Sequence, residues 1–153
     1  MNAEIFWLGC LKVTVVLIII AGVIFTFFSH TSITNIINYQ VNKVFFIDVP
    51  PNVPVFMMQS WLIGVMGAIM AGWGCTMLYL IVYPFRKKES WSWRCMFYSV
   101  VFWFILDSGI SGYHGAVFNV VINCILFLQI MAPLLFLRNS FFLKIRPFGK
   151  TTI

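Results

Sequence analysis

The chain has 153 residues, of which 61% are hydrophobic and 9% are charged, and its formal net charge is +6 at pH 7. Soluble proteins average about 25% charged residues, and a domain of this size leaves much of its surface in contact with solvent. These values exclude a water-soluble fold, and they predict a single membrane domain occupying residues 1–153.

The first apolar segment, from about residue 11 to residue 28, predicts a membrane-spanning helix. Lys12 lies near its start, where a lysine can extend its ammonium group to the lipid headgroups. An apolar run behind one lysine also resembles a secretory signal peptide, but the small residues typical of a cleavage site do not follow it. We therefore expect a retained helix.

A polar segment, residues 29–55, comes next and contains an amphipathic pattern. Apolar residues recur at helical spacing, at Ile33, Ile36, Ile37, Val41, Val44 and Phe45. Polar residues occupy the opposite face, at Thr34, Asn35, Asn38 and Asn42. The pattern predicts a helix lying in the membrane interface; a prolonged first helix and a lid over the other helices are the alternatives. Pro50, Pro51 and Pro54 then predict a stiff turn.

The second span is predicted from about residue 56 to residue 83. Its small residues form two rows at four-residue spacing: Gly64, Ala68 and Gly72, and Gly67, Ala71 and Cys75. Small residues four apart allow another helix to approach closely in a membrane. We expect the row Gly64, Ala68 and Gly72 to be a helix-packing surface, within the subunit in preference to a homodimer seam.

Two further spans are predicted, from about residue 91 to 111 and from about residue 116 to 137, before a basic tail over residues 138–153. Only residues 112–115 separate these two spans, so their helices must be antiparallel neighbours. Pro133 either kinks the last helix or marks its end.

The basic residues other than Lys12 and Lys43 are Arg86, Lys87, Lys88, Arg94, Arg138, Lys144, Arg146 and Lys150. They lie after the second span or after the fourth, in segments on the same side of a bilayer, and the positive-inside rule makes that side cytoplasmic. We therefore predict an all-α integral membrane four-helix bundle with an amphipathic interfacial helix, in the cell (inner) membrane, with both termini cytoplasmic. This placement explains the charge without nucleic acid, for which no recognition motif is present.

Polar residues in the last two spans form the candidate site. Asp107 and Ser111 share one helical face, and Asn119 and Asn123 share a face of the next helix. The short connection, which contains His114, must bring these faces together. An ionisable residue in or near a span is costly and indicates a functional site by default. We predict a ligand-binding pocket lined by Asp107, Ser111, His114, Asn119 and Asn123.

Three interpretations of this pocket compete. In the first, its hydrogen bonds hold two helices together. In the second, it binds a ligand, cation or lipid headgroup, or it passes protons. In the third, Asp107 and His114 form an acid–base pair. An enzyme at this site would lack a nucleophile or a second carboxylate, unless Asp48 approaches Asp107. No metal-ligand spacing or C-x-x-C pair occurs, so we expect no catalytic residue, metal or cofactor. Haem ligation by His30 and His114 is the weakest alternative.

Residues 84–123 contain the runs PFRKKESWSW, WFILDSGIS and GAVFNVVIN. They resemble small four-span bacterial inner-membrane proteins to which no activity is assigned, and the resemblance implies no reaction. The function favoured by the sequence is a non-catalytic binding protein or accessory subunit, with the lipid bilayer and a homo-oligomer or partner membrane subunit as partners. A small oligomeric transporter and a lipid-active enzyme using Asp107 and His114 are the alternatives.

Overall fold

The computed structural model describes residues 3–47 and 51–142, and the regular structure in these ranges is helical throughout. The helices are α1 (Ala3–Phe27), the short 3-10 helix η1 (Ser32–Thr34), α2 (Asn35–Phe45), α3 (Val53–Val82), α4 (Ser90–Tyr113) and α5 (Val117–Phe142). The prediction of an all-α chain is confirmed. Its four long helices are each long and apolar enough to cross a membrane.

The long helices extend beyond the predicted spans. The shortest, α4, has 24 residues, which at 1.5 Å per residue gives about 36 Å against a hydrocarbon core of about 30 Å. Pro133 does not end α5, which continues to Phe142. Because proline has no backbone N–H, this position leaves the Gln129 carbonyl without its helical partner. The predicted basic tail from residue 143 onward lies outside the described residues.

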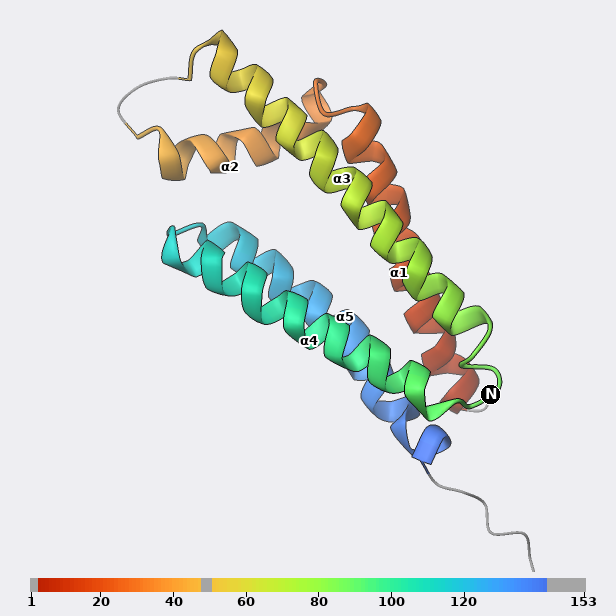
Figure 1. Ribbon diagram of the computed structural model, residues 1–153. Helices are drawn as coiled ribbons and strands as arrows, with labels where there is room; N and C mark the ends of the chain where they lie inside the picture. The colour runs from red at the N-terminus through yellow and green to blue at the C-terminus, as the bar shows by residue number, and fades with distance from the viewer. Residues whose placement is uncertain (1–2, 48–50, 143–153) are drawn as a thin grey trace, which may run out of the picture.

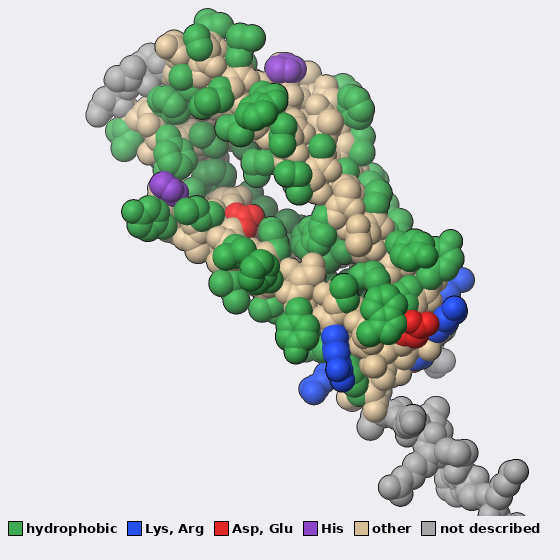
Figure 2. Space-filling view, in the orientation of Figure 1, with side chains coloured by type: hydrophobic (Ala, Val, Ile, Leu, Met, Phe, Trp, Pro, Cys, Tyr) green, Lys and Arg blue, Asp and Glu red, His purple; other side chains and the backbone are tan. Residues whose placement is uncertain are grey.

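The long helices form two hairpins (Figure 1), with α1 beside α3 and α4 beside α5. The hairpins meet at the end that carries the N-terminus and diverge toward the other end, where α2 lies. The space-filling view shows an opening between the two arms, and its blue basic side chains gather near their junction (Figure 2). The four long helices therefore form an open V, and the opening between the hairpins was not predicted from the sequence.

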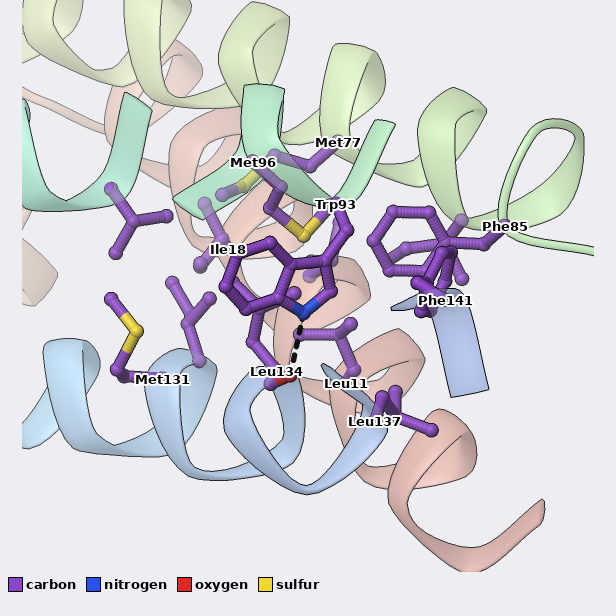
Figure 3. Close-up of a cluster of buried hydrophobic side chains, with 14 residues drawn as sticks. Leu11, Ile18, Met77, Phe85, Trp93, Met96, Met131, Leu134, Leu137 and Phe141 are labelled. Atoms are coloured by element: carbon purple, nitrogen blue, oxygen red, sulfur yellow. Dashed lines mark hydrogen bonds between the residues drawn. The ribbon is translucent and has the colours of Figure 1, made fainter. Parts of the chain in front are cut away.

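The junction of the two hairpins contains the main apolar core (Figure 3). Trp93 of α4 lies at its centre, and its indole N–H donates a hydrogen bond of 2.7 Å to the Leu134 carbonyl of α5. The buried side chains come from all four long helices and the loop after α3: Leu11, Val15, Ile18, Met77, Ile81, Phe85, Trp93, Met96, Val100, Ile130, Met131, Leu134, Leu137 and Phe141. The two hairpins pack against each other at this core.

Polar and ionic contacts reinforce the junction. Lys88, in the loop between α3 and α4, forms an ion pair with Glu4 of α1. Its ammonium also lies 5.6 Å from the ring centroid of Phe141. Farther along the arms, Trp73 of α3 donates a hydrogen bond of 3.2 Å to the Ser99 hydroxyl of α4. The Trp73 bond ties α3 to α4 on the junction side of the opening, and the two Lys88 contacts tie the loop between them to α1 and α5.

Close packing of α1 against α3 depends on glycine. A Cβ atom at Gly22 would lie 2.6 Å from the Ala71 nitrogen and 2.6 Å from the Gly67 oxygen, and one at Gly67 would lie 2.6 Å from the Gly22 oxygen. The tightest contact within the chain is therefore made by Gly67 and Ala71. Of the expected row, Gly64 contacts the end of α1 and the residues after it: a Cβ atom there would lie 3.6 Å from the Thr26 carbonyl oxygen and 3.5 Å from Ser29 Oγ. Ala68 and Gly72 are exposed instead.

The short helix α2 presents its polar face to the rest of the protein. Asn38 is only 4% exposed, whereas Ile36 on the opposite face is 74% exposed. Asn42 accepts a hydrogen bond of 2.9 Å from the Gln59 amide of α3. The amphipathic helix predicted from the sequence is thus present as a separate helix. Ile36 and Phe45 of its apolar side face away from the protein, while Ile37, Val41 and Val44 are half-buried.

The two glycine environments of α3 predict opposite results for one substitution. Gly67→Ala places a methyl group against the backbone of α1, so we expect it to destabilise the fold by about 1–3 kcal/mol. Gly72→Ala meets no atom within 4 Å, and we expect it to be neutral or to stabilise the helix by up to about 1 kcal/mol. Thermal unfolding in detergent measures both; equal effects would contradict the described α1–α3 contact.

Candidate functional site

The turn between α4 and α5 sets the geometry of the site. Gly115 adopts φ +72°, a left-handed conformation that glycine reaches without strain. The Gly115 N–H donates to the Gly112 carbonyl at 3.1 Å, and the Ala116 N–H donates to the Ser111 carbonyl at 2.8 Å. These are the two hydrogen bonds of a Schellman motif, which closes a helix with glycine after its cap. The chain therefore reverses in a few residues, and α5 returns beside α4.

Asp107, Ser111 and Asn119 form one hydrogen-bonded group across the two helices. The Asn119 amide nitrogen donates to Asp107 Oδ1 and to Ser111 Oγ, each at 2.8 Å. Ser111 Oγ also donates to Asp107 Oδ1, at 3.3 Å. Ser111 is buried, while Asp107 and Asn119 are half-buried. Three of the five predicted site residues are therefore in direct contact, and we name them the Asp107 cluster.

Asn123 belongs to a second rung of the same interface. Its amide nitrogen donates a hydrogen bond of 3.3 Å to Ser108 Oγ, and its side chain is 3% exposed. Ser108 was not among the predicted site residues. The sequence did carry a signal for it, because Ser108 and Asn123 are nearly equidistant from Gly115 in an antiparallel hairpin. Together the two rungs form a polar strip along the outer half of the α4–α5 contact.

His114 does not join the Asp107 cluster, although the sequence placed it there. It is the cap residue after α4 and is exposed. Its ring lies 5.9 Å from the ring of Phe45 at the end of α2 and 5.0 Å from that of Tyr113. Its position in the turn directs it past the helix ends. No hydrogen bond links His114 to Asp107 in the described structure, so the geometry does not assemble an acid–base pair.

The Asp107 carboxylate has a free oxygen. Within residues 3–47 and 51–142, the hydrogen bonds that Asp107 accepts all go to Oδ1. Asp107 forms no ion pair with these residues; the ion pair that they contain joins Lys88 to Glu4 at the junction. A half-buried carboxylate with one uncommitted oxygen is an acceptor for a donor or cation from outside the chain. Asp48, the second carboxylate that an enzyme would need, lies outside the described residues.

A second buried polar group lies between α2 and α3. Asn38 and Gln59 are 4% and 6% exposed, and Ser60 is fully buried. Both side-chain atoms of Asn38, Gln59 Oε1 and Ser60 Oγ have no hydrogen-bond partner among the described residues. We did not predict Gln59 and Ser60 as site residues from the sequence. The signal that could have found them is the presence of two polar residues inside an apolar span. No group of three potential metal ligands occurs among the described residues.

No family model, curated protein or solved structure matches this sequence. The resemblance of residues 84–123 to small four-span bacterial proteins therefore rests on the quoted runs alone. The interpretation of the site follows from its geometry and chemistry.

Double-mutant cycles distinguish the two partners predicted for Asp107. Combining Asp107→Ala with Asn119→Ala should give a coupling free energy of about 0.6–2 kcal/mol, the range for hydrogen bonds between membrane helices. Combining Asp107→Ala with His114→Ala should give a coupling near zero, because the structure shows no bond between them. Unfolding in detergent measures both cycles, and a strong Asp107–His114 coupling would contradict this geometry.

Proposed function

We propose that this protein is a non-catalytic binding protein of the cell (inner) membrane that acts as an accessory subunit. In this proposal the opening between its two hairpins receives a partner, and the Asp107 carboxylate anchors it. The partner offers a positive charge or several hydrogen-bond donors, as a basic side chain of a membrane protein or an amine headgroup does.

The proposed orientation rests on charge placement. Basic residues gather at the junction of the hairpins, in the loop after α3, at the start of α4 and near the end of α5: Arg86, Lys87, Lys88, Arg94 and Arg138. The positive-inside rule assigns this end to the cytoplasm. The opening, α2 and the Asp107 cluster then lie on the external side, and α2 lies in the membrane interface with its apolar face toward lipid.

The observation that carries the proposal is the position of an uncompensated aspartate beside an incomplete helix contact. In a membrane a charged carboxylate is costly unless it is paired or solvated. Here Ser111 and Asn119 orient the carboxylate through Oδ1, and the other oxygen remains for a ligand. An opening between helices beside an oriented carboxylate with an unused oxygen is the arrangement expected of a binding site.

The alternatives receive less support from the same geometry. A small oligomeric transporter needs an enclosed path through the membrane, which two diverging hairpins provide only after assembly. The exposed Ala68 and Gly72 are the available surface for that assembly. A lipid-active enzyme needs a base or nucleophile beside Asp107, and His114 faces elsewhere.

Native purification followed by mass spectrometry tests the proposed role of Asp107. The parent chain is expected to retain a stoichiometric protein or lipid that Asp107→Asn loses, because the amide removes the charge while keeping the side-chain shape. Glu89→Gln is the matched control: it makes the same change at the junction end, where Glu89 accepts a hydrogen bond from Trp91.

The melting temperature separates binding from structure. The proposal expects Asp107→Asn and the control to melt close to the parent. If Asp107→Asn instead retains the same components as the parent and only lowers the melting temperature, the cluster serves to hold α4 to α5 and the binding role is wrong.

A further inference from the structure

A cavity lies between α2 and the α4–α5 turn, outside the Asp107 cluster. Its volume is about 390 Å³, within the range of small-molecule sites. Its lining residues come from the end of α2 and from the turn with the start of α5: Gln40, Lys43, Val44, Ile47, His114, Gly115, Val117 and Phe118. The Phe45 and His114 rings, 5.9 Å apart, connect the two sides.

Each polar side chain of this cavity can donate a hydrogen bond, and Lys43 adds a positive charge. Lys43 supplies an ammonium group, His114 an imidazole and Gln40 an amide. None of the described residues that line the cavity is acidic. Within the described part of the chain Lys43 forms no ion pair. A cavity with this set of groups attracts an anion rather than a cation.

The remaining lining is apolar. Val44, Ile47, Val117 and Phe118 surround the polar groups, and Ile47 is 79% exposed at the cavity edge. The apolar face of α2, which includes the exposed Ile36 and Phe45, continues from this wall. A ligand that matches these surfaces has an anionic head and an apolar tail.

We propose that this cavity binds a phosphate group, the headgroup phosphate of an anionic phospholipid, held by Lys43 and His114 with the acyl chains against α2 and α5. Free inorganic phosphate offers the same anionic chemistry without the tail. The site is separate from the Asp107 cluster, since no residue of that cluster lines the cavity.

The test is native mass spectrometry of the full chain in detergent with added phosphatidylglycerol or phosphatidylcholine. We expect the parent to retain phosphatidylglycerol in preference to phosphatidylcholine, because none of the described lining residues is an acid that would receive the choline cation. The double variant Lys43→Gln/His114→Gln should retain phosphatidylglycerol at least about tenfold more weakly, as expected for losing hydrogen bonds to a charged group.

The matched control is Lys87→Gln/His30→Gln, which makes the same two changes at exposed positions outside the cavity. It should retain phosphatidylglycerol as the parent does. Equal loss in the control would show that net charge alone is responsible and would overturn the site, as would equal retention by the parent and the double variant. If the parent and the double variant retain the lipid equally, the remaining role of Lys43 is to stabilise the C-terminal end of α2 with its positive charge.

Added inorganic phosphate distinguishes the two sources of the anion. If inorganic phosphate does not displace phosphatidylglycerol, the site binds the lipid. Inorganic phosphate that displaces it from the parent, and raises the melting temperature of the parent but not of the double variant, assigns the same groups to free phosphate. The double variant leaves the hydrogen bonds of Asp107 unchanged, so its outcome is independent of the proposed partner-binding role.

Discussion

Helices in a bilayer gain little free energy from burying apolar side chains against one another, because the lipid tails are equally apolar. Close packing and hydrogen bonds must therefore hold them together. This protein meets that requirement in three places: the glycine contact of α1 with α3, the Trp93 core at the junction, and the polar strip between α4 and α5. Between the outer halves of the two hairpins no comparable contact exists in the described structure, and there the hairpins diverge (Figure 1). At that end the ring of Phe45 on α2 approaches the ring of His114 in the α4–α5 turn.

This distribution separates structure from binding. The junction combines an apolar core with an ion pair and an indole hydrogen bond, which fix the relative position of the hairpins. The open end contains the polar groups with unused hydrogen-bonding capacity, on α2, α3 and α4. Buried polar atoms without partners are rare in folded proteins and call for an explanation. Their concentration at the end where the helices separate supports the view that this end meets other molecules.

Much of this arrangement could be predicted from the sequence, and the reasons for the rest are physical. Hydropathy fixed the four long helices, and the short 112–115 connection brought Asp107, Ser111 and Asn119 together. Sequence periodicity could not place His114, because a residue in a turn has no helical face. Nor could it choose between two glycine rows on α3: both satisfy the spacing rule, and only the approach of Gly22 selects Gly67. The opening between the hairpins depends on contacts between distant residues, which composition does not encode.

Distances between spin labels in a bilayer test the central claim, that the hairpins join at the junction and separate beside Asp107. Label pairs would join α3 to α4, one at Leu62→Cys and Leu106→Cys, the other at Tyr79→Cys and the native Cys95, with the other cysteines replaced by alanine. All four positions are exposed. The account predicts a clearly longer distance for the first pair than for the second. Equal distances, as in a closed bundle, would contradict it.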